Sequence, residues 1–422
     1  MKTHTKMSIR NGRVFSRDLQ FHRKDVLISN GWFAADGDPS SAEHGNTDKT
    51  SRPASQDAPS DETVLDASGC YVIPGLIDIH FHGALGYDIC DTAPEAFEKI
   101  AAYEAGCGIT AICPATLTLP SEALLHALAV GAAYAREHSA QRRSPSQADL
   151  IGFNMEGPFI SYEKRGAQNP DYILPCDVGL LHRFIEASDG LLKIIGLAPE
   201  ANPGFEDYIR RVPDSVTISL AHTNCDYDIA RRALNAGADH LVHMYNAMRD
   251  LSHRDPGPIG AVMDHLRQHP ESDLTCELIC DGIHVHPSAV RAAFRLMGSR
   301  HIILISDSLR CTGMPDGDYD LGGELTAKSG RYCRLKNNDP NGAPGNIAGS
   351  VSNLMDCLQT AVTQMDIPLE AAVASATLYP AERIGADKLY GSIEPGKRGN
   401  LVLLDQESLQ VRAVVKDGVQ IR

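Results

Sequence analysis

The 422-residue sequence has no long hydrophobic run, no apolar segment at its start and no excess of basic residues. A membrane-spanning helix needs roughly 20 consecutive apolar residues, and no stretch of the chain approaches that length. The first six residues, Met-Lys-Thr-His-Thr-Lys, lack the apolar segment of a secretory signal peptide. We therefore expect a cytoplasmic protein without a membrane partner.

Cysteine pairs with metal-binding or redox spacing are also missing. The eleven cysteines are odd in number, scattered and never arranged as Cys-x-x-Cys, which is typical of free thiols in a reducing compartment. Acidic residues outnumber basic ones by 54 to 39, and the net charge of −15 argues against nucleic acid as a partner. A small anionic substrate is compatible with this charge, because local groups can capture a phosphate inside an acidic protein.

The centre of the chain alternates between short apolar strands and helical patterns. Helices are expected at 93–105, 121–137 (with Ser121 as N-cap), 176–187, 227–236 and 287–296, and a last helical region at 350–376. Strands are expected at 76–80, 109–113, 150–155, 193–198, 216–221, 240–243, 277–281 and 302–306. Eight strands, each followed by a helix or a long connection, predict an α/β protein with a (β/α)8 barrel of the TIM type. A doubly wound sheet is the alternative, but the even number of strands and the chain length favour the barrel.

Both ends of the chain are rich in short strands. Asn11-Gly12 and Asn30-Gly31 lie between apolar runs and are typical of hairpin turns. Residues 36–62 are rich in Ser, Asp, Pro and Gly, and we expect a flexible insertion there. We infer that the two ends pair into one small β-sandwich domain. The expected domains are residues 1–73 with 385–422 for the β domain, and residues 74–384 for the catalytic barrel.

The first barrel strand ends in two histidines, His80 and His82. Residues i and i+2 of a strand point to the same face, so these imidazoles lie side by side while Ile79 and Phe81 face the other way. Two imidazoles on one strand face make half of a metal site. Alone, such a pair is more often incidental than functional.

Most of the later strands also end in a polar or titratable residue. The carboxyl ends of all barrel strands meet on one face, where the active sites of such barrels lie. Histidines and acids together on one rim form a nitrogen and oxygen ligand set suited to Zn(II), Fe(II), Mn(II) or Co(II), and the sequence does not choose among them. The residues at these strand ends are His80, His82, Glu156, His222, His243, Asp281 and Asp307.

Several motifs make the sequence similar to the N-acetylglucosamine-6-phosphate deacetylase family of the amidohydrolase superfamily, over nearly its whole length. Tyr-Asn-Ala-Met and Asp-Gly-Ile-His-Val separate this family from dihydroorotases and hydantoinases. The motifs are Pro-Gly-Leu-Ile-Asp-Ile-His-Phe-His-Gly (74–83), Met-Glu-Gly-Pro-Phe (155–159), Ala-His-Thr-Asn (221–224), Val-His-Met-Tyr-Asn-Ala-Met (242–248), Asp-Gly-Ile-His-Val (281–285), Ile-Ser-Asp (305–307), Ala-Gly-Ser (348–350) and Ala-Thr-Leu-Tyr-Pro-Ala (376–381).

The resemblance implies a metal site in two parts. Glu156, His222 and His243 match the principal metal site, and His80 and His82 match a second one. Glu156 would bridge two ions when both are bound. Asp307 matches the catalytic acid/base and is also counted among the metal ligands. The cofactor implied is one or two divalent ions per chain, zinc or iron first and manganese or cobalt as alternatives.

The resemblance also implies the substrate contacts. His284 matches a substrate-contacting histidine, and Asn246, Ala247 and Arg254 match residues around the phosphate. Arg254 would reach in from a neighbouring subunit, which implies a homodimer. One position departs from the family, because Gln168 stands where well-known members have a histidine that contacts the acetamide of the substrate.

The chemistry of amide hydrolysis agrees with this resemblance. A bound metal ion can supply the nucleophile by lowering the pKa of water to around 7, and Asp307 can move the proton to the leaving amine. The expected reaction converts N-acetyl-D-glucosamine 6-phosphate to D-glucosamine 6-phosphate and acetate, in amino-sugar catabolism. The alternatives are N-acetylgalactosamine 6-phosphate or another N-acyl amino-sugar phosphate as substrate, and a non-catalytic scaffold that has kept the barrel.

Overall fold

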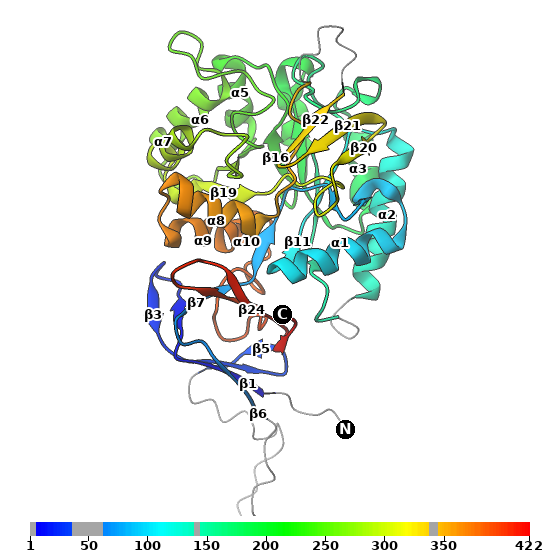
Figure 1. The fold of residues 1–422 in the computed structure, drawn as a ribbon. Helices are drawn as coiled ribbons and strands as arrows, with labels where there is room; N and C mark the ends of the chain where they lie inside the picture. The colour runs from blue at the N-terminus through cyan, green and yellow to red at the C-terminus, as the bar shows by residue number, and fades with distance from the viewer. Residues whose placement is uncertain (1–5, 36–61, 139–143, 337–344) are drawn as a thin grey trace, which may run out of the picture.

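The computed structural model describes residues 6–35, 62–138, 144–336 and 345–422. Parallel strands follow one another around a barrel in the order of the sequence (Figure 1). The third strand is divided in two, so that β13 pairs with β11 and β14 pairs with the short strand β12 (Ala115–Thr116). The barrel strands are β8 (Leu76–Asp78), β11 (Ile109–Ile112), β13 (Asp149–Leu150) with β14 (Phe153–Met155), β15 (Leu192–Leu197), β16 (Thr217–Leu220), β17 (His240–Leu241), β18 (Thr275–Ile279) and β19 (Ile302–Ile305).

The last strand returns to the first at the carboxyl ends. The N–H of Asp307 donates to the carbonyl of His80 at 2.9 Å, and the N–H of His82 donates to the carbonyl of Ser308 at 2.7 Å. A doubly wound sheet would reverse its strand order at one point, whereas here neighbours in space are neighbours in sequence. The predicted (β/α)8 barrel is therefore confirmed.

Helices surround the barrel and connect its strands. Helix α2 has the predicted bounds, but the prediction of Ser121 as its N-cap is wrong, because Pro120 occupies the cap and Ser121 is already helical. The N-cap of α3 is Asp177, whose side chain accepts a hydrogen bond from the Leu180 N–H. The helices are α1 (Pro94–Cys107), α2 (Ser121–Glu137), α3 (Val178–Ala187), α4 (Phe205–Arg211), α5 (Tyr227–Ala236), α6 (Gly257–Gln268), α7 (Pro287–Met297), α8 (Leu354–Met365), α9 (Leu369–Ala376) and α10 (Leu378–Arg383).

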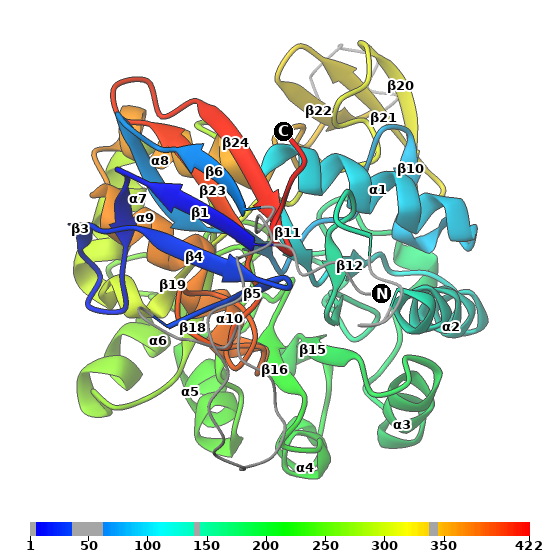
Figure 2. The same ribbon diagram turned by 90° about the horizontal axis from the view of Figure 1, so that it is seen from below.

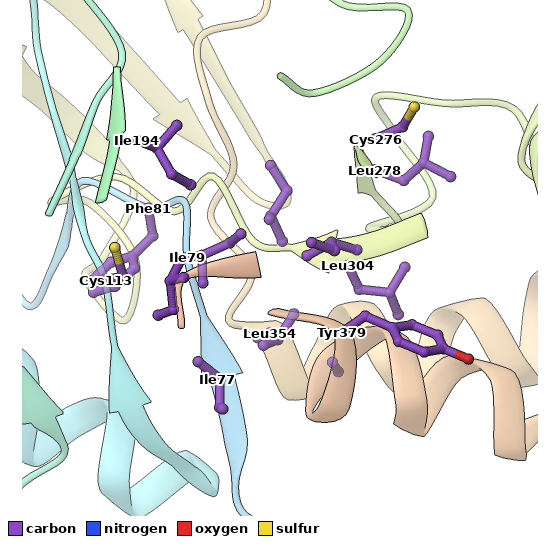
Figure 3. Close-up of a cluster of buried hydrophobic side chains, with 14 of the residues drawn as sticks. Ile77, Ile79, Phe81, Cys113, Ile194, Cys276, Leu278, Leu304, Leu354 and Tyr379 are labelled. Carbon is purple, nitrogen blue, oxygen red and sulfur yellow. The ribbon is translucent and has the colours of Figure 1, made fainter. Parts of the chain in front are cut away.

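Alternation along the first strand separates the core from the site. Ile77, Ile79 and Phe81 are completely buried in the main hydrophobic cluster. In Figure 3 these side chains lie among other apolar side chains, including Leu354 of α8 and Tyr379 of α10. Apolar burial contributes about 25 cal/mol per Å², so this packing anchors β8 and the segment directly after it, which carries His80 and His82.

The two ends of the chain form a β-sandwich below the barrel (Figures 1 and 2). One sheet has the order β5-β4-β1-β6 and the other β25-β24-β23-β7-β2-β3, with an apolar cluster between them. β7 near the start of the chain pairs antiparallel with β23 near its end. The strands are β1 (Lys6–Arg10), β2 (Arg13–Phe15), β3 (Phe21–Arg23), β4 (Val26–Ser29), β5 (Trp32–Phe33), β6 (Glu62–Asp66), β7 (Cys70–Pro74), β23 (Leu401–Asp405), β24 (Val411–Lys416) and β25 (Val419–Gln420).

The sandwich predicted from both ends of the chain is thus confirmed, whereas the exact domain boundaries stay a prediction. Of the expected insertion, residues 36–61 lie outside the described residues, and Glu62 begins β6. Asn30-Gly31 does connect a hairpin, β4 with β5. The hairpin predicted at Asn11-Gly12 is wrong, because β1 and β2 belong to different sheets and the turn carries the chain from one to the other.

A three-stranded sheet after β19 was not predicted from the sequence. It consists of β20 (Gly317–Leu321), β21 (Glu324–Ser329) and β22 (Tyr332–Leu335), paired as antiparallel neighbours. Figure 1 shows it at the end of the barrel opposite the β-sandwich. All eleven cysteines are free thiols, and within the described ranges no helix is long and apolar enough to cross a membrane.

Candidate active site

A cavity of about 270 Å³ opens at the carboxyl ends of the barrel strands. Nine of the residues singled out in the sequence line it: His82, Glu156, Gln168, His222, His243, Asn246, Ala247, His284 and Asp307. His80 does not line the cavity and is completely buried. Leu321 of the unpredicted sheet also lines the cavity, so that sheet forms part of its wall.

The carboxylate of Glu156 lies at the centre of the polar cluster. Its Oε1 is 2.7 Å from Nε2 of His222 and 2.9 Å from Nε2 of His243. Nε2 of His80 and Nε2 of His82 each lie 3.5 Å from one of the two carboxylate oxygens. The backbone next to Glu156 is also crowded, since a Cβ on Gly196 of β15 would lie 2.1 Å from the Glu156 carbonyl oxygen.

All four imidazoles are oriented through their other ring nitrogen. In each case Nδ1 faces a protein oxygen, which fixes the proton on Nδ1 and leaves the Nε2 lone pair directed at the cluster. The partners are the carbonyl of Ala115 for His82 (3.1 Å), the carbonyl of Lys164 for His222 (2.8 Å), the carbonyl of Asn246 for His243 (3.1 Å) and the carboxylate of Glu277 for His80 (2.7 Å).

Among the described residues, two overlapping groups of side chains can hold a metal ion. The first is His80, His82 and Asp307, and the second is His80, Glu156 and His243, with ligand atoms within 4.8 Å of one another in each. All of these side chains are buried. His80 belongs to both of these groups, whereas the family resemblance assigned it only to the second metal site, together with His82.

Opposite charges within the cluster shift its ionisation. Burial by itself raises the pKa of Glu156, but the charge and hydrogen bonds of the adjacent imidazoles hold it well below its ordinary value. Burial lowers the pKa of His80, but Glu277 and Glu156 outweigh this effect and hold it well above its ordinary value. Burial raises the pKa of Asp307, but the hydrogen bond from His82 and the charges of His80 and His82 together outweigh it and lower the pKa. The cluster therefore keeps its carboxylates ionised and available as ligands.

Three of the ligand candidates have left-handed backbone conformations. The φ angles are +43° at His222, +24° at His243 and +50° at Asp307. Such conformations cost of order 1–3 kcal/mol each in a non-glycine residue and persist only where surrounding structure enforces them. They lie just beyond the ends of β16, β17 and β19, where the chain turns sharply to direct each side chain toward the cavity.

Gln168 connects the cluster to the neighbouring strand end. Its Oε1 accepts a hydrogen bond from the Thr118 N–H at 2.7 Å, and its Nε2 donates to Oε2 of Glu156. Only one amide orientation satisfies both contacts, because the N–H of Thr118 requires an acceptor and the carboxylate requires a donor. One N–H of the side-chain amide is thus directed at Glu156.

Asp281 supports a cavity residue and belongs to neither metal-binding group. Its Oδ2 lies 2.8 Å from Nδ1 of His284, and its Oδ1 accepts from the N–H groups of Ile283 and His284. Burial lowers the pKa of His284, but the Asp281 carboxylate outweighs it and raises the pKa above its ordinary value.

Arg254, unlike the other predicted metal and substrate residues, neither lines the cavity nor belongs to a metal-binding group in its own chain. It is exposed in the loop before α6 and does not line the cavity. Asp255 pairs instead with Arg249 at 2.8 Å. Among the residues that the structure describes, Arg254 has no ion-pair or hydrogen-bond partner, so the pairing with Asp250 or Asp255 that would make it structural does not occur.

Two functional candidates were missed in the sequence, Glu277 and His240. Both are completely buried in the barrel interior, where Glu277 contacts His80 and His240. The available signal was a charged residue within the expected apolar strand, since an unpaired charge is almost never fully buried. The sequence did not indicate which residues Glu277 would contact.

A parallel barrel with imidazoles and carboxylates gathered at its carboxyl rim has the architecture of the metal-dependent barrel hydrolases. The model of the amidohydrolase family matches residues 71–421. An N-acetylglucosamine-6-phosphate deacetylase of Bacillus subtilis strain 168 is 32% identical over 413 residues, covering 96% of each chain. An N-acetylgalactosamine-6-phosphate deacetylase of Escherichia coli O157:H7 is 33% identical and covers 81% of this chain and 86% of its own.

Solved structures agree with these matches. The N-acetyl-D-glucosamine-6-phosphate deacetylase of Mycobacterium smegmatis superimposes with a TM-score of 0.80 at 26% identity, covering 99% of this chain and 100% of its own. The chain belongs to the amidohydrolase family and, within it, to the N-acetylglucosamine-6-phosphate deacetylases.

Proposed function

We propose that the chain hydrolyses the acetamide of N-acetyl-D-glucosamine 6-phosphate to D-glucosamine 6-phosphate and acetate. The observation that carries this proposal is the convergence of four imidazoles and two carboxylates on one cavity, in a chain that is 32% identical to a deacetylase of that name over 96% of its length. Hydrolysis of an amide at neutral pH needs an activated water and a proton donor for the leaving amine, and this cluster has groups suited to both tasks.

The donor set fits a divalent cation. Nε2 of His80 is buried without a hydrogen-bond partner, and a buried polar atom is costly unless a ligand completes it. Glu156, His222 and His243 would hold one ion and His80 and His82 a second, with Glu156 shared and Asp307 within reach of the second. Zinc or iron suits this nitrogen and oxygen set, with manganese and cobalt as alternatives. The ion, when bound, supplies Lewis acidity for the attacking water and for the acetyl carbonyl.

Asp307 is proposed as the acid/base. Its Oδ1 lies 3.3 Å from Nε2 of His82 and 3.9 Å from Nε2 of His80, and the side chain is 11% exposed at the cavity wall. The lowered pKa of Asp307 keeps its carboxylate ionised at neutral pH, so that its oxygen can accept the proton of the water. The same oxygen can then deliver this proton to the nitrogen of the leaving amino sugar.

His284, Asn246 and Ala247 are proposed to contact the sugar phosphate, since all three line the cavity. Lys164 is the only lysine or arginine among the described residues of the cavity wall. The described cavity wall of one chain therefore offers little positive charge to a phosphate dianion. This supports a further basic group supplied by a second subunit. We infer a homodimer in which Arg254 of each subunit enters the site of the other, where its planar guanidinium can donate two parallel hydrogen bonds to phosphate.

The galactosamine epimer is the second candidate substrate, because a deacetylase named for it is 33% identical to this chain. The test is an activity panel of N-acetylglucosamine 6-phosphate, N-acetylgalactosamine 6-phosphate and longer N-acyl analogues with metal-reconstituted protein. We expect the highest kcat/KM with the glucosamine compound. A preference for the galactosamine epimer would reassign the substrate, and failure to release acetate from any of these compounds would reject the proposed activity.

A further inference from the structure

A continuous chain of hydrogen bonds passes through the barrel interior and ends at His80. Oγ1 of Thr275 lies 2.7 Å from Nδ1 of His240, and Nε2 of His240 lies 2.9 Å from Oε1 of Glu277. Oε2 of Glu277 lies 2.7 Å from Nδ1 of His80. His80, His240 and Glu277 are completely buried, so these contacts are shielded from solvent.

When both imidazoles are neutral, as a histidine must be to bind a metal ion, the chemistry of the four groups permits one arrangement of protons. An ionised carboxylate only accepts hydrogen bonds, so both histidines must present an N–H to Glu277. His240 then carries its proton on Nε2, and its Nδ1 accepts from the hydroxyl of Thr275. His80 carries its proton on Nδ1, and its Nε2 keeps a free lone pair on the side of Glu156 and Asp307.

Glu277 also fixes the backbone of the cluster. Its Oε2 accepts from the backbone N–H of His243 at 3.1 Å, beside the bond from His80. One carboxylate thus holds the ring of one ligand candidate and the main chain of another. Glu104 provides a contrast, because it is equally buried, both of its oxygens have no hydrogen-bond partner, and burial raises its pKa well above the ordinary value. The hydrogen bonds of Glu277 therefore come from its place between His80, His240 and the backbone of His243, and burial alone does not provide them.

We propose that Glu277 and His240 are positioning residues for metal binding, which hold the proton of His80 on Nδ1 and so present Nε2 to an ion. The inference rests on the proposed function, because it needs a metal centre at His80. Hydrogen bonds of this kind to a ligating histidine orient the ring and raise its basicity, and their loss typically reduces metal affinity about 10- to 100-fold.

The test is the Glu277→Gln variant of the full chain, stripped of metal and titrated with Co²⁺, whose visible absorption reports the ligand geometry. Glutamine cannot accept from both histidines, because one end of its amide is a donor. One imidazole must therefore move its proton, and the charge that supports His80 is lost. We expect Co²⁺ affinity about 10- to 100-fold weaker for the ion at His80, a changed spectrum and a lower kcat at saturating metal.

Glu104→Gln is the control, since it makes the same side-chain replacement at an equally buried position whose oxygens have no hydrogen-bond partner. It should bind Co²⁺ like the wild type. His240→Leu provides a second variant if Glu277→Gln does not fold, because it removes the donor to Glu277 without touching His80, and it should weaken binding in the same direction but less.

The outcomes separate this inference from the proposed function. Wild-type affinity and spectrum in folded Glu277→Gln or, if that variant is unfolded, in His240→Leu would overturn the positioning role while leaving the deacetylase activity standing. A wild-type protein that binds no Co²⁺ and releases no acetate would overturn the proposed metal site and this inference with it.

Discussion

Gln168 gives the sharpest test of the site, because it is the position at which this chain departs from the family pattern. Gln168→Ala removes two hydrogen bonds, one from the Thr118 N–H and one to the Glu156 carboxylate. The side-chain amide has a second N–H, which can donate to the acetamide oxygen of a substrate. A lost hydrogen bond to a charged or developing charged group costs about 1–3 kcal/mol, so kcat/KM should fall about 5- to 150-fold.

Two measurements show whether this loss of kcat/KM comes from the contact of Gln168 with the substrate or from its contact with Glu156. Steady-state kinetics with N-acetylglucosamine 6-phosphate report the substrate contact, and Co²⁺ titration reports the support given to Glu156. If Gln168 acts through the acetamide alone, kcat/KM falls while Co²⁺ affinity stays at the wild-type value. If it acts through Glu156, both fall together.

Gln168→Glu extends the test at nearly constant volume. A second carboxylate facing Glu156 replaces an attractive hydrogen bond by repulsion between like charges, so this variant should be less active than Gln168→Ala at neutral pH. Wild-type kcat/KM in Gln168→Ala would refute both roles. A fully active Gln168→Glu would refute the contact with Glu156.

The remaining predictions concern proton transfer, metal count and assembly. Asp307→Asn should retain fold and metal content but lose about 10²- to 10⁴-fold in kcat, and near-normal turnover would reject Asp307 as the acid/base. The double variant His80→Ala, His82→Ala should bind about one ion fewer per chain by metal analysis, and an unchanged metal content would make both histidines structural. Arg254→Ala should weaken phosphorylated substrates far more than an unphosphorylated N-acetyl sugar, whereas Arg267→Ala, at an arginine 75% exposed on α6, should not. Mixing Arg254→Ala with Asp307→Asn chains should restore activity, because one site of the heterodimer keeps both residues; no rescue despite subunit exchange would place Arg254 in its own site or in none.

Much of the architecture could be predicted from local sequence patterns. Apolar strands that alternate with amphipathic helices predict a parallel barrel, and the carboxyl ends of parallel strands necessarily share one face. His80, Glu156, His243 and Asp307 could therefore be placed on one rim without any knowledge of distances. Alternation with a period of two also predicted that Ile79 and His80 face opposite sides. In the structure Ile79 lies in the hydrophobic core and His80 in the metal-binding groups.

Other features depended on contacts that local patterns do not record. Asn11-Gly12 and Asn30-Gly31 have the same local chemistry, yet only the second connects paired strands. β1 pairs with β4 and β6 in one sheet, whereas β2 pairs with β3 and β7 in the other. The strands β20, β21 and β22 were likewise not predicted from the sequence. They complete the wall of the cavity through Leu321.

The sequence by itself determined which side chains end the barrel strands, because strand direction and alternation follow from neighbouring residues along the chain. Only the tertiary structure decided which nitrogen of each histidine is free. The partner that holds Nδ1 of His80 is Glu277, 197 residues away. A proton position set by a contact so distant in sequence leaves no periodic pattern, since the contact exists only once the barrel closes and both side chains meet in its interior.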